Sequence, residues 1–188
     1  MSIISITTSA AYLPTFQKSL HVIFDEALPQ LLTPDGVIFL NGHITRQDKE
    51  AEEIRVIDLG SGDGRVVLEA SRRGYCAVGY EINPLLVLIS KLWNAFCEIR
   101  MSERIRGSAS FYVKDIWDIS AAEIGEARLI FVYGLGPIMQ RLAEKLHKEG
   151  HPNLIVVSNV FEIKSTLWQR VYHNQEVNVH IYKRRKVQ

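Results

Sequence analysis

The sequence predicts an α/β fold with a doubly wound seven-strand sheet, an N-terminal helix before it and an antiparallel hairpin at its C-terminal end. A short apolar run, a glycine-rich turn and a helical pattern follow one another at 56–71, the order of a buried strand, a tight turn and a helix. Strand-like and helical runs then alternate over 76–160, and 166–183 alternates polar and apolar residues in two segments. The first two observations indicate a Rossmann-like sheet with helices on both faces, and the third indicates the hairpin.

The composition is that of one globular domain. The 188 residues are 47% hydrophobic and 23% charged, and this length can bury a sizeable core. A formal net charge of +1 gives no electrostatic case for a nucleic-acid partner or an anionic membrane surface. No apolar run reaches the roughly 18 to 20 residues that span a bilayer. We therefore expect a single domain at 1–188, no membrane span and no nucleic-acid partner, and the oligomeric state stays open.

Cysteine usage and the first residues bear on the compartment. Cys76 and Cys97 lie in apolar segments without the spacing of a metal site, so we expect reduced thiols and no bound metal. Residues 1–11 lack the arginines of a mitochondrial transit peptide and the basic start of a secretory signal. These features predict a cytoplasmic protein, and a mitochondrial location remains open for a eukaryotic chain.

Three parts are expected within the domain. Residues 1–34 hold an N-terminal segment and a helix with apolar residues at helical spacing. Residues 37–53 form an inserted hairpin, which turns at Asn41-Gly42, and a polar loop for which the sequence gives no function. Residues 54–188 form the sheet and its helices.

The glycine-rich turn and its charges predict the ligand. The turn comprises Gly60, Ser61, Gly62, Asp63 and Gly64. Its glycines let the backbone turn sharply and approach a ligand where a side chain would clash. Asp58 and Asp63 would repel a diphosphate, and Arg65 replaces the third glycine of a dinucleotide fingerprint, which disfavours an NAD-binding oxidoreductase. A ligand with a positive charge and no phosphate, such as S-adenosylmethionine, suits these carboxylates.

Glu81 follows the second predicted strand, about 20 residues beyond the glycines. A carboxylate at this position commonly accepts hydrogen bonds from both ribose hydroxyls of a bound nucleoside. Asn83 and Pro84 then start a helix as its N-cap and first residue, and we include Asn83 among the cofactor-binding residues. Because residues 85–96 are apolar on most sides, we expect that helix to be largely buried.

The remaining elements follow from apolar runs and alternation. Strands are expected at 109–113, 127–133 and 154–160, a helix at 139–148, and a final hairpin of 167–172 with 177–182 through a turn at 173–176. The continuous apolar run at 154–160 is typical of a buried parallel strand.

Two central motifs resemble a known family. Asp58-Leu-Gly-Ser-Gly-Asp-Gly-Arg65 and Val78-Gly-Tyr-Glu-Ile-Asn-Pro84 resemble the seven-strand S-adenosylmethionine-dependent methyltransferases. Among these the chain is most similar to the protein-lysine methyltransferases that modify the ring protein of ATP synthase (its c subunit) and the adenine nucleotide translocase, and to their prokaryotic relatives. Tyr12-Leu-Pro-Thr15 and Leu154-Ile-Val-Val-Ser-Asn159 fit the same pattern.

The resemblance implies further site residues and a reaction. Tyr12 and Thr15 would lie over the cofactor as a lid, Asp115 would bind the adenine amino group, and Ile116 would cover the adenine ring. It also implies S-adenosylmethionine as cofactor, S-adenosylhomocysteine as product and a protein as substrate. The segment 37–53 is longer than is usual in this family, which is a departure.

The acceptor is expected to be a protein lysine. Tyr133 ends the fourth predicted strand beside the donor site, so we expect it to line the acceptor channel. In-line displacement on the sulfonium requires alignment rather than a dedicated base, since desolvation can lower the pKa of the amine. We therefore assign no catalytic residue. A small-molecule methyltransferase of the same fold and a non-catalytic S-adenosylmethionine-binding protein remain the alternatives.

Overall fold

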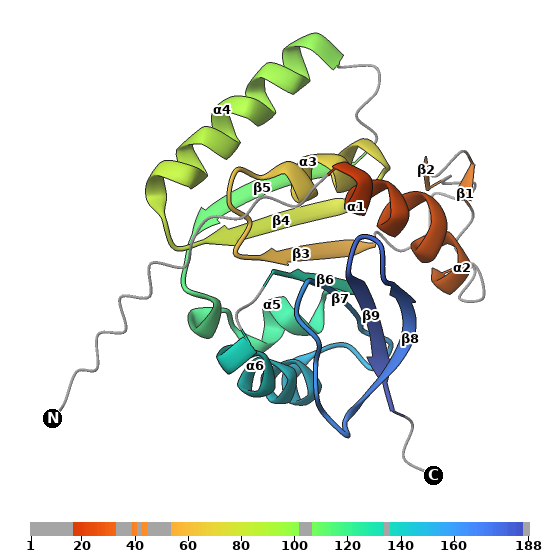
Figure 1. Cartoon of the computed structure of the whole chain (residues 1–188). Coiled ribbons are helices and arrows are strands. Elements are labelled where there is room, and N and C mark those ends of the chain that lie inside the picture. The colour runs from red at the N-terminus through yellow and green to blue at the C-terminus, as the bar shows by residue number, and fades with distance from the viewer. Residues whose placement is uncertain are drawn as a thin grey trace, which may run out of the picture.

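Strand β3 (Arg55–Leu59) lies at the centre of a seven-stranded sheet with the order β5-β4-β3-β6-β7-β9-β8 (Figure 1). The structure is a computed structural model that describes residues 17–32, 39–40, 43–44, 54–101, 107–133 and 136–185. The other strands are β4 (Cys76–Glu81), β5 (Ser108–Val113), β6 (Leu129–Val132), β7 (Ile155–Asn159), β8 (Trp168–Asn174) and β9 (Val179–Arg184). Strands β3 to β7 are parallel, and β9 pairs antiparallel with β7 and β8. The predicted fold is confirmed.

Helices cover both faces of this sheet. Besides the N-terminal helix, they are α3 (Arg65–Arg72), α4 (Pro84–Met101), η3 (Ile116–Asp118), α5 (Ala121–Gly125) and α6 (Gly136–Glu149). One core cluster joins α3 and the N-terminal helix to the face that carries Val56 and Phe131, and a second joins α5 and α6 to the face that carries Ile57 and Ile130. Successive residues of a strand point to opposite faces, so β3 is apolar on both sides because both of its faces are covered.

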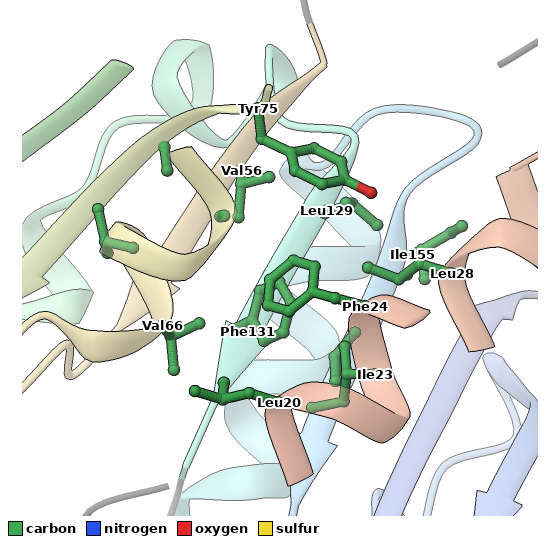
Figure 2. Packing of buried hydrophobic residues seen from close by; sticks show 14 of the residues in the cluster. Leu20, Ile23, Phe24, Leu28, Val56, Val66, Tyr75, Leu129, Phe131 and Ile155 are labelled. Carbon is green, nitrogen blue, oxygen red and sulfur yellow. The ribbon is translucent and has the colours of Figure 1, made fainter. Parts of the chain in front are cut away.

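The predicted N-terminal helix consists of α1 (Gln17–His21), the π-helical η1 (Val22–Ala27) and α2 (Leu28–Leu32). Phe24 packs between Tyr75 and Phe131, with ring centroids 5.8 and 5.4 Å apart (Figure 2). Arg73, just after α3, forms ion pairs with Asp25 of η1 and Glu69 of α3. These contacts fix the N-terminal helix on the face of the sheet that α3 also covers.

A short hairpin lies between the N-terminal helix and β3. Strand β1 (Phe39–Leu40) pairs antiparallel with β2 (His43–Ile44), where the sequence predicts an inserted hairpin. The rest of that insertion lies outside the described residues, as do Tyr12 and Thr15. Within the described ranges no helix is long and apolar enough to cross a membrane.

The last turn lies two residues later than predicted. Strand β8 continues to Asn174, and the turn occupies 175–178 rather than 173–176. The side-chain oxygen of Asn174 accepts the amide N–H groups of Glu176 (3.0 Å) and Val177 (3.3 Å). Asn178 closes the turn with a φ of 52°. An asparagine that accepts nearby amides and another that adopts the left-handed conformation thus fix the turn here.

Helix α4 is much more exposed than predicted, and the expectation that it is largely buried is wrong. Of its described side chains only Val87, Ser90 and Cys97 are buried. The helix packs mainly against β5 and β4 at one end of the sheet, and Figure 1 shows it on the rim of the molecule. A helix that is apolar on most sides usually lies in a core. Here only one side of it is covered by the described part of the chain.

Candidate active site

The carboxyl ends of the parallel strands form one edge of the sheet, and the strand order reverses direction between β3 and β6. Helix α3, which follows β3, covers one face, whereas α6, which follows β6, covers the other. Ligands of open α/β sheets bind in the crevice beyond the strand ends at such a switch point. The predicted residues on β3, β4 and the loop between β3 and α3 lie at this edge.

The glycines of the loop have distinct structural roles. Gly60, Gly62 and Gly64 have φ values of 83°, 55° and 82°, in the left-handed region where glycine is unstrained. A Cβ on Gly64 would lie 2.6 Å from the Phe111 ring, so Gly64 is needed for packing. A Cβ on Gly60 would meet no atom within 4 Å. Gly60 therefore borders open space at the switch point, where a ligand can approach the backbone.

The backbone amides of the loop are already used within the protein. The N–H groups of Gly60 and Ser61 donate to the carbonyl of Tyr80 at 2.8 and 3.0 Å. The N–H of Gly62 donates to Oε2 of Glu81 at 3.0 Å. A phosphate-binding loop presents such amides to its ligand. These three amides are therefore not available to a diphosphate, which agrees with a ligand that contains no phosphate group.

Asp58 is a buried carboxylate, 5% exposed, at the end of β3. Burial raises its pKa to about 7, and the negative charges of Glu81 and Asp63 act in the same direction. The described residues supply no hydrogen-bond donor or cation to its side chain. Burying an uncompensated carboxylate is costly, so a ligand with an ammonium group would be stabilised here.

Asp63 differs from Asp58 because it has a partner. Its carboxylate accepts Nε of Arg65 at 3.0 Å and Nη2 of Arg65 at 2.6 Å. The sequence predicted Asp63 to be a charge available to a cationic ligand, but Arg65 largely compensates it. The preference for positive charge therefore rests on Asp58.

Glu81 is held from both sides by backbone amides. Its Oε2 accepts the N–H of Gly62, and its Oε1 accepts the N–H of Asn83 at 2.9 Å. A carboxylate has about four acceptor sites, so both oxygens can still accept ribose hydroxyls. Asn83 in turn accepts the N–H of Leu85 at 3.0 Å, which makes it the predicted cap of α4. Any contact of Asn83 with cofactor remains a prediction.

The residues expected around the adenine lie after β5. Oδ1 of Asp115 accepts the N–H of Trp117 at 3.0 Å and caps η3, which leaves Oδ2 for a ligand. Ile116 is half-buried. Sequence reasoning missed Ile82, which follows Glu81 and is 67% exposed. The available signal was an apolar residue between the Glu81 carboxylate and the Asn83 cap, a position where its side chain offers a surface to a flat ring.

Strands β6 and β7 end side by side, and each is followed or closed by a residue with a polar side chain. Val132 is opposite Ser158 in the parallel pairing, so Tyr133, which follows β6, and Asn159, the last residue of β7, lie at the same edge of the sheet. Tyr133 is half-buried, and its ring lies edge-on to Phe161 with centroids 6.1 Å apart. Asn159 is buried, and its Oδ1 has no hydrogen-bond partner among the described residues. The sequence assigned a site role to Tyr133 but not to Asn159, although the segment 154–159 fits the family pattern, because an unpaired amide oxygen is visible only in the folded chain.

The chain is similar in sequence to known methyltransferases. The model of the ANTKMT methyltransferase domain matches residues 58–170. The chain is 36% identical over 96 residues to the human lysine N-methyltransferase of the ATP synthase c subunit, a match that covers 50% of this chain and 36% of that protein. It is 30% identical over 139 residues to a protein-lysine N-methyltransferase of Saccharolobus islandicus, covering 73% and 79%. The match thus spans only about a third of the human relative.

A solved structure is similar over nearly the whole chain. The RNA methyltransferase from Salinibacter ruber, in complex with S-adenosyl-L-homocysteine, superposes with a TM-score of 0.64 at 25% identity. The match covers 94% of this chain and 97% of that one.

Proposed function

We propose that this chain, which belongs to the ANTKMT methyltransferase domain family, transfers a methyl group from S-adenosylmethionine to the side chain of a protein lysine. S-adenosylmethionine is the cofactor of this domain. The observation that carries the proposal is Asp58, a buried carboxylate without a cation among the described residues, beside the open backbone of Gly60. Relatives that methylate protein lysines, as their names state, support the choice of acceptor.

The residues present fit this cofactor. Asp58 would accept the ammonium of its methionine part, and Glu81 the ribose hydroxyls. Oδ2 of Asp115 would accept the adenine amino group, and Ile82 and Ile116 would cover the ring. When bound, S-adenosylmethionine supplies an electrophilic methyl group on its sulfonium.

The protein must then present a neutral amine to that methyl group. A lysine with a pKa near 10.4 costs roughly 4.6 kcal/mol to neutralise at pH 7. Exclusion of water from the acceptor would lower this cost, because desolvation disfavours the ammonium. Tyr133 and Asn159 lie where the acceptor would enter, and the unpaired Oδ1 of Asn159 can accept an amine hydrogen. If the hydroxyl oxygen of Tyr133 and Oδ1 of Asn159 each accept one N–H of the lysine amine, the lone pair of its nitrogen is directed at the methyl group.

The class of acceptor is tested with labelled donor. The purified protein and a cell lysate are incubated with S-adenosylmethionine that carries a radioactive methyl group, and label is counted in protein, RNA and small molecules. We expect label in protein, and less of it with Asp58→Asn at a limiting concentration of donor. Label in RNA would favour the chemistry named for the Salinibacter ruber structure, and label only in small molecules would favour a metabolite enzyme. No label in any fraction, with donor bound, would indicate a non-catalytic binding protein.

A cytoplasmic location is part of the same proposal. Neither Cys76 nor Cys97 forms a disulfide bond, which agrees with a reducing compartment. Fractionation of cells that express a tagged chain would test it, and recovery in a membrane-enclosed organelle would contradict it.

A further inference from the structure

The outer side of α4 carries a continuous row of exposed apolar side chains. Leu85, Leu88, Leu92 and Ile99 are 62%, 53%, 64% and 84% exposed. Such a surface is unusual on a folded domain, because large contiguous apolar patches usually mark an interaction site. The proposed active site does not use it, since only the first turn of α4 lies near Glu81.

The spacing along this row is that of a helix-pairing seam. Leu85, Leu88, Leu92, Ala95 and Ile99 are separated by three, four, three and four residues. This is the a/d pattern of two helices that pack side by side. We call these five residues the α4 seam. The buried residues Val87, Ser90 and Cys97 occupy the opposite side of the helix and hold it to the sheet.

The charged residues beside the α4 seam, Lys91 and Glu98, can pair with the same two residues of a second copy of the chain. Lys91 and Glu98 are seven residues apart, so they occupy equivalent positions on the same flank of the seam. When two such helices pair antiparallel, Lys91 of each copy lies beside Glu98 of the other, and the attraction occurs twice. Parallel pairing would place both lysines at one level and both glutamates at another. Glu98 is bonded within the described residues only through the amide of Asn94 at 2.9 Å, so its carboxylate can accept a second donor.

We propose that the α4 seam joins two copies of this chain in a two-fold dimer with antiparallel α4 helices. Leu88 then packs against Ile99 of the second copy, and Leu92 against Ala95 of the second copy. An isologous contact of this kind requires one surface that is complementary to itself, as this one is. The axis passes near residues 93 and 94, about 15 Å along the helix from Asn83. Both active sites therefore stay open at opposite ends of the paired helices.

The flanking charges favour a second copy over a lipid surface. Helices that lie on membranes carry mainly lysine and arginine on their polar side. One flank of the α4 seam instead carries one lysine and one glutamate, and the whole chain has a net charge of only +1. Opposite charges at these positions attract each other across a two-fold contact, whereas a lipid surface offers the glutamate no such partner.

Sedimentation velocity over a wide range of protein concentration tests the proposal. We expect the full chain to sediment as a dimer and Leu92→Glu as a monomer. Lys91→Glu and Glu98→Lys should each raise the dimer dissociation constant by about tenfold, since each places like charges together. The double variant K91E/E98K should restore it to within about threefold, because the pair is only exchanged. Val171→Glu, on the exposed part of β8, is the matched control and should leave the dimer intact.

Two readouts keep the result specific. Circular dichroism and S-adenosylhomocysteine binding must show that each variant is folded. A chain that is monomeric at every concentration, or a double variant as weak as the single ones, would overturn the proposal. Flotation with phosphatidylcholine vesicles is measured in parallel. A monomer that floats with the vesicles, and loses this with Leu92→Glu, would assign the face to lipid instead.

Discussion

Oε2 of Glu81 accepts the amide N–H of Gly62 at 3.0 Å, so the carboxylate at the end of β4 is tied to the glycine loop that follows β3. Two motifs that are apart in the sequence are thus one unit. A change at Glu81 should therefore affect both the ligand and the loop.

Glu81→Ala should weaken binding of S-adenosylhomocysteine by roughly 1.5–3 kcal/mol, the range for hydrogen bonds to a charged group. It should also lower the free energy of unfolding, because the N–H of Gly62 loses its acceptor. Glu81→Gln, which keeps one acceptor oxygen, is the milder control. Calorimetry measures the affinity, with NAD as the comparison ligand. Equal binding of NAD by the wild type would show that the loop accepts a diphosphate after all.

Asp58 should make the stability of the cofactor-free protein depend on pH. Burial, followed by the charges of Glu81 and Asp63, raises its pKa from 3.8 to about 7. Between these two values the folded protein keeps a proton that the unfolded chain has lost. The contribution of Asp58 to the free energy of unfolding is therefore fully present below about pH 4 and is lost as pH rises to about 7. The whole change is about 4 kcal/mol. Urea unfolding should show Asp58→Asn gaining stability relative to the wild type as pH rises from about 4 to about 7. A constant difference would contradict the raised pKa.

The same group should govern affinity for the cofactor. Only the ionised carboxylate attracts the ammonium of the ligand, so the affinity of the wild type for S-adenosylhomocysteine should rise through about pH 7 and then level off. Asp58→Asn should bind more weakly and lose this rise. Calorimetry across this pH range provides the measurement, and an identical pH profile in the variant would remove Asp58 from the ligand site.

The glycines at 60 and 64 should separate binding from folding. Both have a φ above 80°, so alanine is strained at either position. Gly64→Ala should lose more stability, because its Cβ would lie 2.6 Å from Phe111 and 2.9 Å from Ser90. Gly60→Ala should fold with a smaller loss of about 1 kcal/mol and bind S-adenosylhomocysteine poorly, because its Cβ enters the open space. Thermal unfolding and calorimetry of the pair decide this, and full binding by Gly60→Ala would contradict the placement of the ligand.

Tyr133 and Asn159 should act on the acceptor rather than on the donor. Tyr133→Phe and Asn159→Ala should each lower the single-turnover rate at saturating donor, by about tenfold for the loss of one oriented hydrogen bond. Affinity for S-adenosylhomocysteine should change little. The rate of the wild type should also rise with pH as the amine deprotonates. If either variant lost donor affinity instead, its residue would belong to the donor site or to the core.

Local patterns predicted most of the fold, because the glycine spacing, the Asn83 cap and the apolar strands act over a few residues. The burial of α4 was predicted wrongly, since helical periodicity shows which residues are apolar but not what covers them. The compensation of Asp63 by Arg65 was within reach of the sequence, only two residues away. The unpaired oxygen of Asn159 was not, because it depends on which strands become neighbours. The lid formed by Tyr12 and Thr15 remains a prediction, as those residues lie outside the described part of the chain.

The central claim is transfer of a methyl group to a lysine, and mass spectrometry of the labelled lysate proteins tests it most directly. The donor carries a deuterated methyl group, the labelled proteins are digested, and the modified residue is located by fragmentation. We predict deuterated methyl groups on lysine side-chain nitrogens, and fewer of them when Asp58→Asn replaces the wild type at a limiting concentration of donor. Deuterated methyl groups on carboxylates, histidines or arginines, with none on lysine, would contradict this claim.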